Sequence, residues 1–270
     1  MDVQEVVRLH QVWRTYSRQG ERADFRQVNL TQANLRDAAL QEADFRQADL
    51  TGTDLQGADL RYANFMYTDL RRTHLQDALL GGTNFFGADL GGLDLHQTQL
   101  TGIDFSHANL SHANLSNTVL SGSNLRGANL QHANLSHAIL TNASLRSADL
   151  SHARLEHATL RGVDLRYIDL SHADLSHADL NQTNWFGAQL KGAILNHTIL
   201  PTGELWEAYR DEVVPSLCTL GGVPLAQVAA AWDCHHWATS PMAVAFDIHK
   251  MADCHPQLRP RVEQFIHLFD

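Results

Sequence analysis

Large apolar residues recur at every fifth position from residue 25 to residue 200. Leucine holds 30 of these 36 positions, phenylalanine five and tryptophan one. A second column, two residues earlier, holds alanine at 22 places and threonine at eight, and the residue between the columns is mostly Asp or Asn. A period of five is neither the 3.6 of an α-helix nor the 2 of a strand. The pattern therefore predicts a chain that bends at a fixed interval and points one large and one small residue inward per segment.

Aromatic residues add a longer period of 20 to this pattern. They occupy one of every four large positions, namely Phe25, Phe45, Phe65, Phe85, Phe105 and Trp185. We therefore expect four segments per coil, about nine coils, and an aromatic ladder along one wall. At a strand-like spacing of about 4.8 Å per coil, the rod would be roughly 43 Å long. Each coil of such a solenoid contacts only its neighbours, so both ends need caps.

Five residues in the small column are larger than alanine, serine or threonine, and we expect the coil to bulge where they lie. They are Val28, Leu93, Ile103, Val163 and Ile168.

Residues 23–200 resemble the pentapeptide-repeat family, whose pattern is a small residue, Asp or Asn, Leu or Phe, and two variable positions. The register begins in the stretch RADFRQVNL and continues without an insertion. The resemblance implies an all-β solenoid, a right-handed quadrilateral β-helix with β-turns at its corners.

Histidine is frequent at the position two residues after each large centre. Between residues 27 and 197 this position holds Gly 11 times and His nine times. Both tolerate positive φ better than most residues, so the simplest interpretation is a corner residue. The histidines nevertheless form two columns with a spacing of 20, which are His112, His132, His152 and His172, and then His137, His157, His177 and His197. The alternatives are opportunistic metal binding or a rod that weakens below about pH 6, where imidazoles in general begin to charge.

The chain divides into three predicted parts, which are residues 1–20, 21–200 and 201–270. The first is predicted to be an amphipathic capping helix over residues 2–19, with Asp2 and Glu5 as a capping box and Gly20 as its stop signal. Its apolar face would consist of Val6, Leu9, Trp13 and Tyr16. After Leu200 the period ends, and we expect an α-helical C-terminal module that covers the last coil and offers a second contact surface. Its CHHW and CH stretches match no standard zinc spacing, so we expect neither a metal nor a cofactor there.

Composition and charge limit the partners. The formal net charge is −10, which argues against direct binding of nucleic acid. Three cysteines, an acidic residue at position 2 and no long apolar run predict a cytoplasmic protein that does not enter a membrane. No catalytic constellation or phosphate-binding loop occurs in the sequence, so we expect no enzyme.

Exposed apolar residues are then the best candidates for function. The repeat places Met66, Tyr67 and Phe86 in outward positions of one wall, with Tyr62 one corner away and Phe186 near the far end. Such clusters are typical of partner-binding surfaces, although single exposed apolar residues are also common. On the same wall Arg126, Arg146 and Arg166 form a basic stripe, which is more often a solvated face than a binding one.

Three classes of function follow. The first is a non-enzymatic scaffold or regulatory adaptor that binds another protein, with a homodimer as an open alternative. The second comes from the family resemblance, which includes acidic rods that mimic DNA and modulate gyrase, a type II topoisomerase. Residues 21–200 carry 19 acids against 13 bases, a modest excess for a DNA mimic. The third is a pH- or metal-responsive protein that uses the stacked histidine columns.

Overall fold

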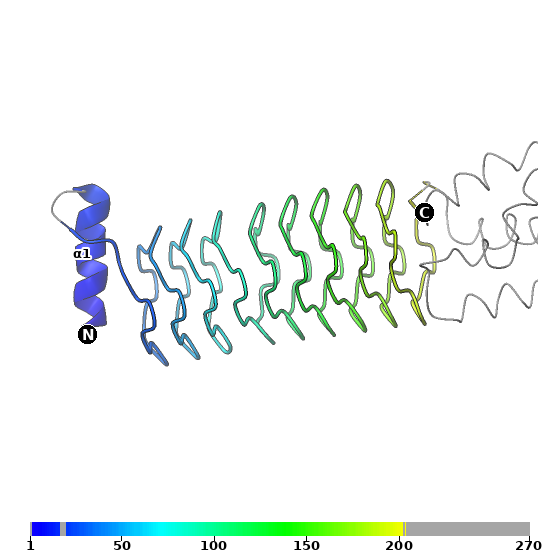
Figure 1. The fold of residues 1–270 in the computed structure, drawn as a ribbon. Coiled ribbons are helices and arrows are strands. Elements are labelled where there is room, and N and C mark those ends of the chain that lie inside the picture. The colour runs from blue at the N-terminus through cyan, green and yellow to red at the C-terminus, as the bar shows by residue number, and fades with distance from the viewer. Residues whose placement is uncertain (1, 17–19, 202, 204–270) are drawn as a thin grey trace, which may run out of the picture.

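The computed structural model describes residues 2–16, 20–201 and 203 (Figure 1). From residue 23 onward the chain winds into stacked coils of 20 residues each. Parallel bridges join residues 20 apart, from Asp24 with Asp44 to Asp179 with Ile199. The predicted C-terminal helical module and its metal-ligand candidates lie outside the described residues.

Each five-residue segment ends in a β-turn. The N–H group of Val28, for example, donates to the carbonyl of Phe25 at 3.1 Å, and that of Ala33 donates to Leu30 at 2.8 Å. The third residue of every turn from residue 27 to residue 197 has positive φ, between 55° and 72°. Positive φ at this position alone is the mark of a type II turn. The frequent glycine and histidine at this position are therefore corner residues, as the simpler interpretation of the sequence predicted.

The Asp and Asn residues before each centre stabilise the same turns. The Oδ1 atom of Asn29 accepts from the N–H group of Thr31, and that of Asp49 accepts from Thr51, both at 2.9 Å. This bond satisfies a backbone donor that the turn would otherwise leave unpaired. The Asp and Asn column thus has a local structural role in the coil.

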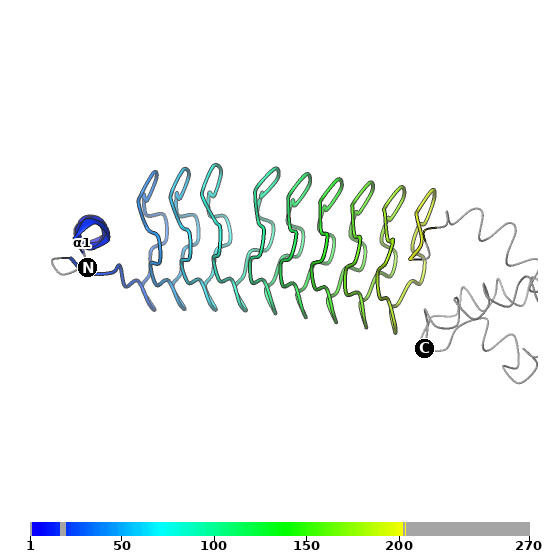
Figure 2. The same ribbon diagram turned by 90° about the horizontal axis from the view of Figure 1, so that it is seen from above.

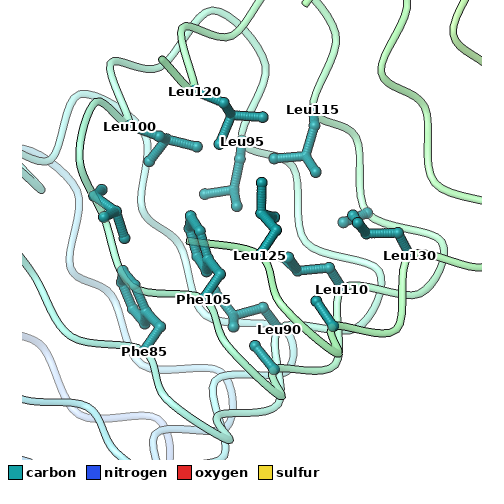
Figure 3. Close-up of a cluster of buried hydrophobic side chains, with 14 of the residues drawn as sticks. Phe85, Leu90, Leu95, Leu100, Phe105, Leu110, Leu115, Leu120, Leu125 and Leu130 are labelled. Carbon is teal, nitrogen blue, oxygen red and sulfur yellow. The ribbon is translucent and has the colours of Figure 1, made fainter. Parts of the chain in front are cut away.

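Both inward columns form one continuous core. Figure 3 shows phenylalanine and leucine side chains from successive coils pointing into the same interior. Rings in the aromatic column stack between Phe25 and Phe105, with centroids of successive rings 4.7–5.2 Å apart. Trp185 occupies the same column and is also buried, but Leu125, Leu145 and Leu165 separate it from the phenylalanines.

The backbone ladder opens at one place on two of the four walls. Leu70 and Phe85 still donate to the next coil, to Asp89 and Asp104, each at 2.8 Å. In the described stretch between them, the eight inter-coil bonds that the period requires are absent. The unpaired N–H groups belong to Arg72, Leu75, Asp77, Leu80, Gly82, Asp94, Gln99 and Asp104. The coils on either side stand farther apart in Figure 2. We call this stretch the ladder gap.

Two bulky residues account for the ladder gap. Leu93 and Ile103 lie in the small column on the C-terminal side of the gap, and both are buried. Their counterparts one coil earlier are Thr73 and Thr83, which are β-branched and larger than alanine, so a large side chain meets a threonine across the gap at both places.

The expected bulge is absent at the other three exceptions. Asp49 still donates to Val28, Asn184 to Val163 and Gln189 to Ile168, at 2.8–3.1 Å. That part of the prediction was wrong, because what matters is the summed volume of a residue and its counterpart on the neighbouring coil. Val28 and Ile168 lie opposite alanines, namely Ala48 for Val28 and Ala148 and Ala188 for Ile168. Val163 lies between Ala143 and Thr183, and valine is smaller than the leucine and isoleucine at the gap.

Helix α1 (Val3–Thr15) lies across the first coil (Figure 1). The Asp2 side chain accepts from the N–H groups of Gln4 and Glu5 and so caps its first turn. The helix is shorter than the predicted 2–19, and Tyr16, expected on its apolar face, is 62 % exposed. Val7 and His10 are the residues of α1 that are fully buried. No helix in the described part of the chain is long and apolar enough to span a bilayer.

His10 joins α1 to the coil. Its Nδ1 atom accepts from the N–H group of Ala23 at 3.0 Å, so this nitrogen is unprotonated. The ring also stacks on Trp13, with centroids 5.3 Å apart. Burial lowers the pKa of His10 below its usual value, because the buried site disfavours the charged ring. The cap therefore depends on a neutral imidazole.

Candidate functional site

One wall of the coil carries most of the exposed aromatic residues. We call it the aromatic wall and define it by its buried centres, which are Phe25, Phe45, Phe65, Phe85, Phe105, Leu125, Leu145, Leu165 and Trp185. The repeat directs the two residues after each centre outward. The side chains that a partner would meet on this wall are therefore fixed by the corner turns.

Met66, Tyr67 and Phe86 lie together near the N-terminal end of this wall. The rings of Tyr67 and Phe86 pack edge to face with centroids 5.5 Å apart, and Phe86 packs in the same way on His107 at 5.5 Å. Tyr67 is 55 % exposed, whereas Met66 and Phe86 are half-buried. Three of the predicted partner-binding residues thus form one surface.

Tyr67 extends over Gly87, one coil further on. A Cβ atom at Gly87 would lie 2.7 Å from the Tyr67 ring, and φ at this glycine is +62°. Glycine therefore makes room for the ring to lie against the wall. Tyr62 stands in the same relation to Gly82 on the neighbouring corner and is 70 % exposed. Among the described residues it makes no ring contact with Tyr67 or Phe86, so it borders this surface without joining it.

A depression of about 640 Å³ adjoins this surface. It is lined by Asp24, Arg26, Gln27, Arg46, Gln47, Met66 and Tyr67. Ion pairs hold its two arginines, with Arg26 2.6 Å from Asp24 and Arg46 2.7 Å from Asp44. The depression therefore has a polar floor and an apolar rim made by Met66 and Tyr67.

A second aromatic pair lies near the other end of the wall. Tyr167 and Phe186 pack edge to face at 5.5 Å, and the guanidinium of Arg146 lies 5.7 Å from the centre of the Tyr167 ring. Sequence reasoning named Phe186 and missed Tyr167. The signal was present, since Tyr167 precedes Phe186 by 19 residues as Tyr67 precedes Phe86, and the stretches around the two phenylalanines, TNFFGADL and TNWFGAQL, match.

The predicted basic stripe lies between the two aromatic pairs. Arg166 is neutralised by Asp164, with their atoms 2.6 Å apart. Within the described residues Arg126 and Arg146 have no carboxylate partner. The middle of the aromatic wall therefore carries two arginines outside ion pairs, and the charge of Arg146 lies close enough to Asp164 to help lower the pKa of that carboxyl.

Both histidine columns stack as their spacing predicted. Ring centroids of successive histidines are 4.8–4.9 Å apart in the column from His112 to His172 and 4.6–4.9 Å apart from His137 to His197. In the part of the chain that the structure describes, no three His, Cys, Asp or Glu side chains converge to hold a metal ion.

Several aspartates of the coil are paired with an arginine two residues later. A hydrogen bond from Arg26 lowers the pKa of Asp24 to about 2. Burial alone would raise the pKa of Asp44, but the side-chain and backbone hydrogen bonds from Arg46 and its charge together outweigh burial, and the pKa is lowered. The same bond lowers the pKa of the aspartates in three further pairs, which are Asp59 with Arg61, Asp69 with Arg71 and Asp164 with Arg166. These pairs reduce the acidic face that a DNA mimic would present.

A family model for pentapeptide repeats matches the coil in 8 copies, over residues 23–61, 63–102, 103–142, 128–166 and 168–201. A comparison with curated protein sequences gives no match.

Solved structures of such proteins are similar to this chain. HetL, involved in heterocyst differentiation regulation in the cyanobacterium Nostoc sp. strain PCC 7120, is 30 % identical over 76 % of this chain and 99 % of its own, with a TM-score of 0.40. QnrB1, a plasmid-mediated fluoroquinolone resistance protein, is 20 % identical over 63 % of this chain and 89 % of its own, with a TM-score of 0.52. The predicted right-handed quadrilateral β-helix is confirmed by the family match and by the likeness to QnrB1.

Proposed function

Because the chain belongs to the pentapeptide-repeat family, we propose that it is a non-enzymatic scaffold or adaptor that binds another protein. The outer walls of the coil provide the first contact and residues 201–270 a second. The protein acts in a reducing compartment, the cytoplasm, as its sparse cysteines suggest.

One observation carries this proposal, namely the cluster of Met66, Tyr67 and Phe86 on the aromatic wall. The core beneath them is filled, so the wall offers a firm surface and no enclosed pocket. Exposed methionine and aromatic side chains are enriched where proteins bind one another. The polar depression beside them supplies hydrogen-bonding groups at the rim of the same surface.

The test is capture of partners from a lysate of the source cells by the full-length protein and two double variants. Met66→Asp with Phe86→Asp places charges on the aromatic wall and should abolish capture. Ser121→Asp with Thr141→Asp places the same charges in equivalent outward positions of a neighbouring wall and should leave capture intact. Both variants should melt near the wild-type temperature, since none of the four side chains is fully buried. If the Met66→Asp with Phe86→Asp variant captures the partner as well as the control variant does, the aromatic wall is removed from the proposal.

A DNA-mimicking modulator of gyrase is the alternative that the fold favours, since QnrB1 has the same fold. The arginine pairs of Asp44, Asp59 and Asp69 weaken this alternative. A supercoiling assay with purified gyrase, with and without a fluoroquinolone, decides the matter. A change in gyrase activity at equimolar protein would favour the DNA mimic over the scaffold.

A pH- or metal-responsive role rests on the stacked histidine columns. Charging neighbouring rings less than 5 Å apart should weaken the coil. The melting temperature should therefore fall between pH 7.5 and pH 5.5, and less so in His137→Asn with His157→Asn, because asparagine also tolerates the positive φ of these corners. An unchanged melting temperature in the wild type would dispose of this role.

A further inference from the structure

The aromatic wall contains the same surface motif twice. A tyrosine at a corner packs edge to face on a phenylalanine of the next coil, and the glycine after that phenylalanine makes room for the tyrosine ring. The two copies are Tyr67, Phe86 and Gly87, then Tyr167, Phe186 and Gly187. Their ring separations are both 5.5 Å, and their interplanar angles are 85° and 86°.

Both copies face the same way because they are separated by whole coils. Tyr67 and Tyr167 are 100 residues apart in sequence, which is five coils of 20. At about 4.8 Å per coil the two pairs are roughly 24 Å apart along the rod. One ligand can therefore reach both, provided that it is extended and runs along the rod axis.

The surface between the two aromatic pairs is basic, and the residues next to its arginines have small side chains. Arg126 and Arg146 project from successive coils without an acidic partner in the described part of the chain, and Arg146 leans over Tyr167 at 5.7 Å. The residues beside them, Gly127 and Ser147, are small.

Two aspartates on this wall are already committed. Asp164 pairs with Arg166 at 2.6 Å, and Asp104 accepts hydrogen bonds from the Ser106 N–H group at 3.0 Å and from Asn124 at 3.1 Å. The net charge between the aromatic pairs therefore favours an anionic ligand.

We propose that the aromatic wall binds an extended acidic segment of a partner protein, with an apolar side chain at each end and carboxylates between them. The apolar ends pack on the two Tyr–Phe pairs, and the carboxylates meet Arg126 and Arg146. A span of roughly 24 Å corresponds to about seven residues of extended chain. This inference rests on the proposed function, because it specifies the partner of the same wall.

The test uses the full-length protein and a fluorescent peptide of about eight residues, with phenylalanine at both ends and aspartates between. Binding is followed by fluorescence anisotropy. Arg126→Glu with Arg146→Glu should weaken binding at least tenfold, and Tyr67→Ala or Phe186→Ala should each weaken it at least about fivefold. Lys191→Glu, a charge reversal at an exposed position outside the aromatic wall, should leave affinity unchanged and serves as the matched control.

Two further peptides test the geometry. A peptide of half the span should lose its sensitivity to either Tyr67→Ala or Phe186→Ala, since it cannot reach both pairs. A peptide of equal charge without the phenylalanines should bind at least tenfold more weakly. The inference is overturned if this peptide binds as well as the first, which is the behaviour of a general polyanion site, or if Lys191→Glu weakens binding as much as the arginine double variant.

This outcome is separable from that of the capture experiment. If the Met66→Asp with Phe86→Asp variant loses its partner but the peptide does not bind, the scaffold stands and the acidic segment is wrong. If capture is unaffected by that variant, the scaffold surface itself is wrong.

Discussion

The ladder gap leads to a prediction that two small substitutions will stabilise the protein. Leu93 and Ile103 lie opposite Thr73 and Thr83, and the inter-coil bonds around them are absent. Where a large residue lies opposite an alanine, as Ile168 does, the ladder is intact. Thr73→Ala with Thr83→Ala recreates that pairing, so we expect the two coils to close.

The hydrogen bonds gained and lost determine the expected change in the free energy of unfolding. Eight recovered backbone bonds, at about 0.5–1.5 kcal/mol each, contribute roughly 4–12 kcal/mol. The cost is the loss of two hydroxyl bonds, from Thr73 to the Leu50 carbonyl at 2.8 Å and from Thr83 to the Leu80 carbonyl, which is about 1–3 kcal/mol in total. Even the lower limit of the gain exceeds the cost, so the free energy of unfolding should rise by one to several kcal/mol.

Thr53→Ala is the matched control. The Thr53 hydroxyl bonds the Leu30 carbonyl at 2.8 Å, but the ladder around it is complete, so this substitution should only destabilise, by about 0.5–1.5 kcal/mol. Thermal and urea unfolding should show a rise in stability for the double variant and a fall for Thr53→Ala. Hydrogen exchange should show the amides of Leu75 and Gln99 slowing in the double variant. A double variant that melts below the wild type, with these amides exchanging as fast as before, would refute the volume argument.

Three further predictions follow from single side chains. Leu130→Asp buries an unpaired charge in the filled core and should destabilise the coil by at least about 3 kcal/mol, measured by urea unfolding. The lowered pKa of His10 means that its contribution to stability is complete above about pH 6.5 and falls as the pH drops below that value, so the protection of the Ala23 amide, measured as its exchange rate relative to the intrinsic rate at the same pH, should fall between pH 7 and pH 5. The lowered pKa of Asp44 has its effect at lower pH, since its contribution is present above about pH 4 and is lost below it; Arg46→Gln should reduce the fall in melting temperature between pH 5 and pH 3.

Much of the fold could be predicted because the period states it directly. A leucine every five residues and a phenylalanine every 20 determine which side chains are buried and which stack. The histidines were correctly placed at corners for the same reason. Bulging at Leu93 was predicted from its own size, but Val163 showed that size alone is insufficient.

The remaining features depend on packing between neighbouring coils or on the ends of the rod, and a local sequence pattern contains neither. The ladder gap arises from the summed volume of residues 20 apart, such as Thr73 with Leu93. Tyr167 was missed because it follows Arg166 in the sequence, whereas Tyr67 follows Met66 and so belongs to a visible apolar cluster. Helix α1 ends at Thr15, short of Gly20, because the last residues of its predicted apolar face find no core to cover; Tyr16 is exposed.

Because no insertion breaks the register, the number of residues between two sites determines both their distance along the rod and the directions in which they face. Parallel bridges join residues 20 apart on both sides of the ladder gap, so deleting 20 residues shortens the rod and leaves every later side chain facing the same direction. Deleting five residues instead turns everything downstream by a quarter of a revolution. Such a deletion between residues 107 and 146 would carry Tyr167 and Phe186 onto the neighbouring wall, away from Tyr67, while the core remained filled. The direction in which each end of the rod faces can therefore be set in steps of five residues.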